Sequence, residues 1–308
     1  MAKGENTMDI LAIDIGGTAI KYGLFDSSGS ALTDLYEKVT PKSETTNYIM
    51  ETITQIVKYM KEKHTIEGIA VSTAGVVDSQ SGSVIFSGPT IPDYTNTPIK
   101  QIIEESFGIP CEVENDVNCA ALGEWWKGAG KGSSSLVCVT IGTGVGGAVI
   151  LNGQLWNGAS YSAGELGYLP MPSGKMLQEE ASATSLIANY SLLSGIPVNQ
   201  LNGKIIFEKA KSGEGKAIKA IDNMLTALNQ GLLAATYLIS PDIIVIGGGV
   251  AVQKEYLENK IEAKLKQHII SDRMLPGKIN CAELGNSAGM IGAIYHFKEK
   301  NLLLAKQK

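Results

Sequence analysis

The residues best suited to chemistry lie in a turn near the start of the chain, between two apolar runs. Asp14 ends the first run, Gly16–Gly17–Thr18 form the turn, and Lys21 lies in the second run. Because the glycines carry no side chains, backbone N–H groups there can curl toward an anion beside a carboxylate. The pattern predicts a β-hairpin that binds a polyphosphate, with Asp14 holding a metal ion through water.

A second turn of this kind, Gly142–Thr143–Gly144, lies within a strand–turn–strand pattern over residues 136–151. With Gly147 it also matches the G-x-G-x-x-G fingerprint of dinucleotide-binding folds, in which a helix begins at the glycines. Here the apolar residues 148–151 follow and then break at a turn, as a strand would. The pattern favours a second phosphate hairpin, with the Thr143 hydroxyl as a donor. Two such hairpins suggest a nucleotide held between two related domains.

An acidic cluster, Glu114–Asn115–Asp116, stands between a short strand pattern at 111–114 and a helix expected at 117–126. In α/β folds, ligands bind where such strands end. Asp116 could serve only as a helix N-cap, a position that Asn and Asp both favour. Three polar residues in succession exceed what a cap needs, so we interpret Asp116 as a general base that accepts a hydroxyl proton.

Two further motifs carry weaker signals. Glu165 lies in GELGY, after a loop of small and polar residues, where a solvated acid and a functional group are equally open interpretations. Three glycines at 247–249 follow a buried-strand pattern. A backbone without Cβ atoms allows close approach, so we favour contact of Gly248 and Gly249 with an adenosine over a plain turn.

The composition is that of a globular protein of one large or two medium domains, with 308 residues, 44% hydrophobic and 19% charged. A net charge of −5 without a basic cluster argues against nucleic acid and membrane surfaces as partners. No apolar run approaches the roughly 20 residues of a membrane helix, and the first residues lack a signal-peptide core. We therefore expect a cytoplasmic protein. The four single cysteines are expected to be mostly buried, reduced thiols.

The hydrophobic pattern alternates strands and helices in two similar halves. The first half has strands expected at 8–14, 19–25, 31–39, 67–72 and 111–114 and a helix at 48–63. The second begins with a strand meander at 136 and continues with helices near 181–194, 216–239 and 254–267, a strand at 242–246 and a closing helix at 286–299. This order predicts an α/β protein with an active-site cleft between two domains, residues 1–116 plus 290–308 and residues 117–289.

Six motifs in order, DIGGTAIKYGLFD, STAGVVD, ENDVNCAALGE, TIGTGVGGAVILNG, GELGY and IIVIGGGV, resemble those of the ROK family of bacterial sugar kinases and repressors. The resemblance spans about residues 9–298 and implies a two-domain actin/hexokinase-like (ribonuclease H-like) fold that binds ATP, Mg²⁺ and a sugar in the cleft. It implies that Asp116 takes the proton of the sugar 6-hydroxyl. It also implies that Asn115 and Glu165 hold sugar hydroxyls and that Gly75 shapes the pocket floor.

The chain departs from the family pattern after Glu165. Kinases of the family usually carry Gly-His there, followed by a Cys-x-Cys-Gly-x-x-Gly-Cys zinc segment. Here Tyr168 stands in place of the sugar-contacting His, and PMPSGKMLQEEASATSL contains no cysteine. We therefore expect no structural zinc. The family's later sugar-binding Glu aligns with Gln178, although Glu179 or Glu180 could stand in.

This zinc-less pattern, with GNSAGMIGAIYHF near the end, is most similar to bacterial β-glucoside kinases. We expect a homodimeric kinase that transfers the ATP γ-phosphoryl group to a β-glucoside such as cellobiose, with N-acetylmannosamine kinase or glucokinase as alternatives. Family repressors carry a helix-turn-helix domain before the first hairpin. Only about eight residues precede it here, which argues against a sugar-responsive transcriptional regulator. A polyphosphate or nucleotide hydrolase would need a water-positioning acid instead of a sugar pocket.

Overall fold

The chain folds into two compact units. The computed structural model describes residues 8–88 and 91–306. Unit 1 comprises Met1–Trp126, Asn157–Ser162 and Asn286–Lys308, and unit 2 comprises Lys127–Trp156 and Ala163–Gly285. The sequence pattern predicts the helix at 117–126 and residues 157–162 within the second domain, whereas the structure groups both with the first.

Unit 1 is built on a five-stranded sheet in the order β3-β2-β1-β4-β7. β1 is antiparallel to β2 and parallel to β4, which in turn is parallel to β7. A separate two-stranded sheet pairs β5 with β6. The elements of this unit are β1 (Asp9–Ile15), β2 (Ala19–Asp26), β3 (Tyr36–Val39), α1 (Ile49–Lys63), β4 (Gly68–Thr73), β5 (Val76–Asp78), β6 (Ser83–Phe86), α2 (Ile99–Phe107), β7 (Cys111–Asn115), α3 (Asp116–Lys127) and, after the 3₁₀ turn η5 (Gly285–Ser287), α9 (Ala288–Lys306).

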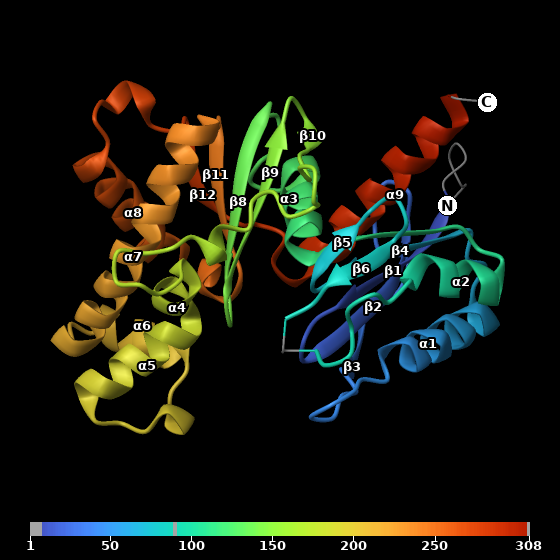
Figure 1. Cartoon of the computed structure of the whole chain (residues 1–308), viewed down its shortest axis with the longest axis horizontal. Coiled ribbons are helices and arrows are strands. Elements are labelled where there is room, and N and C mark those ends of the chain that lie inside the picture. The colour runs from blue at the N-terminus through green and yellow to red at the C-terminus, as the bar shows by residue number, and fades with distance from the viewer. Residues whose placement is uncertain (1–7, 89–90, 307–308) are drawn as a thin grey trace. The chain divides into compact units, whose positions relative to one another are not determined.

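The five-stranded sheet of unit 1 has a hydrophobic cluster on each face. Figure 1 shows helices α1 and α9 on opposite sides of this sheet. On one face α1 buries Ile53, Ile56 and Met60, at the helical spacing that the sequence predicted. The other face carries small residues, among them Ala12 and Ala70, and packs against α9. Because helix α9 comes from the far end of the chain, unit 1 depends on residues almost 300 positions apart.

Close backbone contact explains why α3 belongs to unit 1. A Cβ at Gly292 of α9 would collide with the carbonyl of Cys119 in α3, and one at Gly123 would collide with the carbonyl of Ala288. Glycine at these two positions lets the two helices approach more closely than larger residues would allow. The hydrophobic patterns of α3 and α9 could not predict that these two helices pack together.

Unit 2 repeats the strand arrangement of unit 1, in the order β10-β9-β8-β11-β12. β8 is antiparallel to β9 and parallel to β11, just as β1 pairs with β2 and β4. The elements are β8 (Ser135–Ile141), β9 (Val145–Leu151), β10 (Gln154–Leu155), η1 (Leu166–Tyr168), α4 (Leu177–Ala181), α5 (Ala183–Ser194), η2 (Val198–Gln200), α6 (Gly203–Lys211), α7 (Gly215–Ile239), β11 (Ile243–Gly247), η3 (Gly249–Gln253), α8 (Lys254–His268), η4 (Asp272–Met274) and β12 (Lys278–Cys281).

Several sequence-based expectations are tested by these elements. Residues 145–151 form a strand, so a helix does not begin at the second glycine turn and the dinucleotide-binding interpretation is excluded. The strand expected at 31–39 is wrong in length, because only residues 36–39 form a strand beside β2, while Ala31 makes an isolated bridge to Phe25 of β2. Strands β5 and β6 and helix α6 were not anticipated. All four cysteines are buried and free.

Within residues 8–88 and 91–306, none of the helices is long and apolar enough to cross a membrane. The opening residues 1–7, on which the expectation about a signal peptide rests, and the two residues Pro89–Thr90 lie outside the described residues.

Candidate active site

The first glycine turn is held in place by one threonine from the chain that follows β3. The Gly16 N–H donates to the Ala19 carbonyl (2.9 Å) and closes the turn. The Thr40 hydroxyl donates to the Gly16 carbonyl (2.6 Å), and the Thr40 N–H donates to the Thr18 carbonyl (3.0 Å). The turn carbonyls are thereby directed toward Thr40, which fixes the shape of the Gly16–Gly17–Thr18 loop.

Asp14 lies half-buried beside this turn and has two polar neighbours. The Ser72 hydroxyl donates to its Oδ1 (2.6 Å), and Lys21 stands directly opposite it across the β1–β2 hairpin. Burial raises the pKa of Asp14, while the Ser72 hydrogen bond and the Lys21 charge counter part of that rise. A Cβ at Gly289, in the first turn of α9, would lie 2.9 Å from Asp14 Oδ1, so this helix begins against the carboxylate.

Asn115, and not Asp116 alone, caps helix α3. Its Oδ1 accepts the N–H groups of Val117 (2.9 Å) and Asn118 (3.0 Å). Its Nδ2 donates to the Gly75 carbonyl (2.8 Å) and to Asp116 Oδ1 (3.0 Å). Asp116 Oδ1 also accepts the Val117 N–H (2.9 Å). Because Asn115 supplies most of the N-cap, helix capping is not a sufficient explanation for an acid at position 116.

Gly75 lies at a position that tolerates no side chain. Its φ of +100° is in the region that L-residues rarely adopt, and a Cβ there would lie 2.7 Å from the Phe86 carbonyl. The turn after β4 can therefore pass close to β6 and offer its carbonyl to Asn115. The structure thus brings together Gly75, Asn115 and Asp116, three of the residues singled out from the sequence.

Glu114 and Asn157 form a polar pair that the sequence analysis did not identify. Glu114 is fully buried, and its Oε1 accepts the Asn115 N–H (2.8 Å) and Asn118 Nδ2 (3.0 Å). Its Oε2 accepts Asn157 Nδ2 (3.2 Å), from 43 positions later. Burial raises the pKa of Glu114, and these hydrogen bonds counter part of the rise. No local pattern around Asn157 could have indicated this contact.

The second glycine turn is held by the start of α5. The Gly142 carbonyl accepts the Ala183 N–H (2.9 Å), and the Thr143 carbonyl accepts the Thr184 hydroxyl (2.9 Å). A Cβ at Gly142 would meet nothing within 4 Å, whereas one at Gly144 would lie 2.7 Å from Gln178 Oε1. Gly142 therefore faces open space, while Gly144 faces a residue assigned from the sequence to the sugar.

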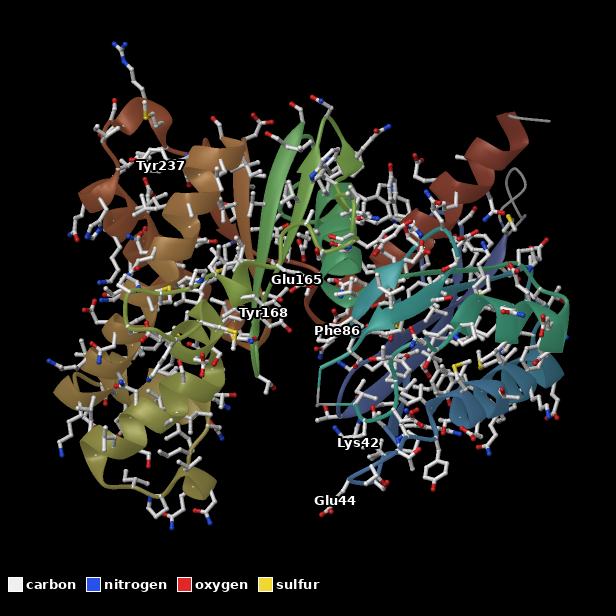
Figure 2. The ribbon with its side chains drawn as sticks, viewed as in Figure 1. Lys42, Glu44, Phe86, Glu165, Tyr168 and Tyr237 are labelled. Carbon is white, nitrogen blue, oxygen red and sulfur yellow. The ribbon has the colours of Figure 1, made fainter. Side chains whose placement is uncertain are left out.

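The loop carrying Glu165 packs against β9. Gly147 of the strand and Gly164 of the loop approach so closely that neither could carry a Cβ without a collision. Gly147 therefore serves this contact between loop and strand. Glu165 is half-buried, which raises its pKa, and the neighbouring Tyr168 is 50% exposed. Figure 2 shows both side chains on this one short stretch of unit 2.

The structure separates the three residues that could replace the family's later sugar-binding Glu. Gln178 is half-buried and lies beside both Gly144 and Gly167. Glu179 Oε2 instead accepts the Met176 N–H (2.8 Å) and caps α4. Glu179 and Glu180 both line a cavity of about 500 Å³ formed with α5 and α7. Of the three, Gln178 is the one that faces the second glycine turn and the loop carrying Glu165.

The glycine run after β11 adjoins the second turn. Gly248 has a φ of +81°, and a Cβ there would collide with the Ile141 carbonyl at the end of β8. Gly249 begins η3, and a Cβ on it would meet nothing within 4 Å. The backbone at Gly248 therefore passes directly beside the strand that leads into Gly142. Among the described residues no group of three or more His, Cys, Asp or Glu is placed to hold a metal ion.

Comparison with known proteins identifies the family. The model of the ROK family matches residues 10–300. The chain belongs to the ROK family. An uncharacterized protein of Clostridium perfringens is 42% identical over 287 residues, which cover 93% of this chain and 97% of that protein. A β-glucoside kinase of Listeria monocytogenes is 33% identical over 301 residues, which cover 95% of this chain and 98% of that protein.

A solved structure shows the same fold. The ROK family glucokinase of Streptomyces griseus, in complex with glucose and AMPPNP, is 29% identical and superposes with a TM-score of 0.80, covering 94% of this chain and 99% of that one. The fold is therefore the actin/hexokinase-like one that the sequence predicted. With kinases among its relatives over nearly the whole length, the chain is a carbohydrate kinase.

Proposed function

We propose that this ROK-family chain transfers the γ-phosphoryl group of ATP to the 6-hydroxyl of a β-glucoside such as cellobiose. The observation that carries the proposal is the polar edge of the unit 1 sheet. β1, β4 and β7 run parallel, and Ile15, Thr73 and Asn115 are in register where these strands end. Asp14 and Asp116 therefore stand at the same edge, which is where α/β sheets bind ligands.

Asp116 is the general base of the proposed reaction. It accepts the proton of the sugar 6-hydroxyl as that oxygen forms a bond to the γ-phosphorus and the bond from phosphorus to the leaving ADP oxygen breaks. Such a base contributes roughly 10²–10⁴-fold to the rate, and positioning and electrostatic stabilisation of the phosphoryl group supply most of the remainder. Asn115 holds the chain beside Asp116 in place. In this proposal it contacts the sugar by sharing the Nδ2–H that it donates to Asp116 Oδ1.

The two glycine turns bind the phosphates in this proposal. In unit 1 these are Gly16–Gly17–Thr18 with Lys21, and in unit 2 Gly142–Thr143–Gly144, with Gly147 supporting the turn and Gly248–Gly249 beside the adenosine. Asp14 fits the hard, oxygen-liganded Mg²⁺ that accompanies ATP, through water, because its carboxylate is the oxygen ligand that such an ion prefers. Burial raises the pKa of Asp14, and the Ser72 hydrogen bond and the Lys21 charge counter part of that rise. When bound with ATP, the ion neutralises phosphate charge.

Glu165, Gln178 and Tyr168 complete the proposed sugar site, with Gly75 as its floor. Support for a β-glucoside comes from the β-glucoside kinase relative and from Tyr168, which replaces the histidine usual in the family. The half-exposed ring offers an apolar face that could pack on a second sugar ring. Glucokinase and N-acetylmannosamine kinase are the alternatives within the family. A homodimer in the cytoplasm, without nucleic-acid or membrane partners, completes the proposal.

A panel assay tests this function. ADP release should depend on added sugar, and kcat/KM should be higher for cellobiose or another β-glucoside than for glucose or N-acetylmannosamine. ADP release without sugar would indicate a hydrolase, and sugar-dependent DNA binding without turnover would indicate a regulator. One apolar contact is worth about 1–3 kcal/mol, which corresponds to a preference of about tenfold or more. A preference of that size for glucose or N-acetylmannosamine would refute the β-glucoside assignment.

Replacing Tyr168 tests the residue that carries this specificity. Tyr168→His restores the side chain usual in the family and should lower kcat/KM for cellobiose relative to glucose. Tyr168→Phe is the matched control, because it keeps the ring and removes only the hydroxyl, so it should preserve the preference.

A further inference from the structure

A short stretch of the chain, residues 157–162, which we call the docked segment, interrupts the sequence of unit 2 but belongs to unit 1. The residues on both sides of this docked segment, up to Trp156 and from Ala163, belong to unit 2. Asn157 begins the segment. Its Nδ2 donates to Ser79 Oγ (3.2 Å) and to Glu114 Oε2 (3.2 Å), and its Oδ1 accepts Asn118 Nδ2 (3.5 Å). One amide thus contacts three separate parts of unit 1.

The other end of the docked segment is held as well. The Tyr161 hydroxyl donates to the Asp78 carboxylate, and this hydrogen bond helps to lower the pKa of Asp78 despite the opposing effect of burial. Tyr161 has a φ of +58°, which a non-glycine residue adopts only when its surroundings enforce it. The segment is therefore a specifically formed contact and not a loop lying loosely on the surface.

Glu114 connects the docked segment to the helix that carries Asp116. It is wholly buried, so each lone pair that loses its donor costs a large desolvation penalty. One of its oxygens accepts donors from Asn115 and Asn118 at the start of α3, and the other accepts Asn157. The same carboxylate therefore holds both the N-terminal turn of α3 and the docked segment.

Because the docked segment is fixed up to Ser162, the short stretch of chain that follows restricts the position of Glu165. Glu165 is the third residue after Ser162, and extended chain covers at most about 3.6 Å per residue, so the link spans no more than about 11 Å. We propose that Asn157, through Glu114, is a positioning residue for sugar binding: it anchors the docked segment and thereby limits where Glu165 can lie. This inference rests on the proposed function.

Exchanging the two polar groups tests the pair. In Glu114→Gln the Nε2 donor would face the Nδ2 donor of Asn157, and in Asn157→Asp two carboxylates would meet in a buried place. In the double variant the amide introduced at position 114 would donate to the carboxylate introduced at position 157, which restores the pair with its direction reversed. Asn152→Asp makes the same chemical change at an exposed turn of unit 2 and serves as the control.

Each single variant should raise KM for the sugar by about tenfold or more, the effect of losing a hydrogen bond to a charged group, while KM for ATP stays within a factor of about two. The double variant should recover most of the sugar KM, and Asn152→Asp should resemble the wild type. Thermal melting of all variants separates this KM effect from general loss of stability, because melting alone would lower the active fraction and not raise KM.

Three results would overturn the inference. If the wild type is an active sugar kinase and the single variants keep their sugar KM, the pair does not position the sugar site. If the double variant binds sugar no better than either single variant, the two residues do not act as a pair. If the wild type shows no sugar-dependent ADP release, the proposed function fails and the inference fails with it.

Discussion

Asn115 donates a 2.8 Å hydrogen bond from its Nδ2 to the carbonyl of Gly75, forty positions earlier in the chain. This bond ties the end of β7 to the turn after β4, at the one glycine there whose φ excludes other residues. The same side chain caps α3 through its Oδ1. Asn115 therefore contributes most of the cap and the bond to Gly75, whereas Asp116 accepts only the Val117 N–H of the cap. Substitutions at the two neighbouring positions should have different effects.

Asp116→Asn should lower kcat by at least about 10²-fold, because it removes the proton acceptor. The melting temperature and the sugar KM should change little, because Asn115 still caps the helix. Steady-state kinetics and thermal melting check both statements. Asn115→Ala is the contrasting variant: it should cost about 0.5–2 kcal/mol of stability through the lost cap. Near-full activity in Asp116→Asn would remove Asp116 from the role of base.

The two glycines of the second turn should respond differently to added bulk. The sequence pattern assigns Gly144 to the phosphate turn, but a Cβ there would lie 2.7 Å from Gln178 Oε1 of the proposed sugar site. Gly142→Val, whose side chain would enter open space at the turn, should raise KM for ATP and leave sugar KM nearly unchanged. Gly144→Val should raise both. A rise in sugar KM alone for Gly142→Val would contradict this division of the site.

His296 should make the protein sensitive to acid. Burial, with smaller contributions from the positive charges of Lys300 and Lys100, lowers its pKa from 6.5 to about 3, and its Nε2 has no hydrogen-bond partner among the described residues. Below pH 6.5 the unfolded chain binds a proton that the folded chain does not, so stability falls as the pH drops toward 3, by up to about 1.4 kcal/mol per pH unit.

Denaturant unfolding between pH 7 and 4 measures this effect. His296→Leu removes the titrating group and should flatten the dependence of unfolding free energy on pH, whatever it does to stability at pH 7. An unchanged slope in the variant would show that other groups, such as the carboxylates, determine the acid sensitivity.

Metal dependence should be confined to Mg²⁺ or a similar hard cation that accompanies ATP. Chelation should abolish turnover, and added Mg²⁺ should restore it. Melting of the nucleotide-free protein should be unaffected by a chelator, because cysteine and histidine ligands for a structural zinc are not expected. Elemental analysis of tag-free protein showing near-stoichiometric zinc would contradict this.

Local patterns were sufficient to predict the two hairpins and their repeat. Two apolar runs joined by a glycine turn predict each of the hairpins β1–β2 and β8–β9. The helical spacing of Ile53, Ile56 and Met60 predicts α1. The assignment of α3 to unit 1 could not be predicted this way, because it depends on contact between Gly123 and Gly292, which are far apart in the sequence and individually resemble any helical glycine.

The candidate site shows the same division. The local sequence marks several of its residues. Asp14 ends an apolar run just before a glycine turn, and Asp116 follows a strand pattern within an acidic cluster. Asn157 has no such context, and its importance arises only from a buried carboxylate 43 positions earlier. The choice among Gln178, Glu179 and Glu180 likewise required the packing of α4 against Gly144 and Gly167.

The chain passes between the two units four times, after residues 126, 156, 162 and 285. Unit 1 therefore cannot be complete until α9, the last helix, covers the sheet face that carries Ala12 and Ala70. During synthesis on the ribosome, chains emerge from the N-terminus onward. Unit 1 is therefore begun first and completed last. Its N-terminal strands are synthesised well before α9, whereas unit 2 has all its residues once residue 285 has been made. A chain that ends before residue 286 would lack α9, and this apolar face of the unit 1 sheet would be exposed to solvent.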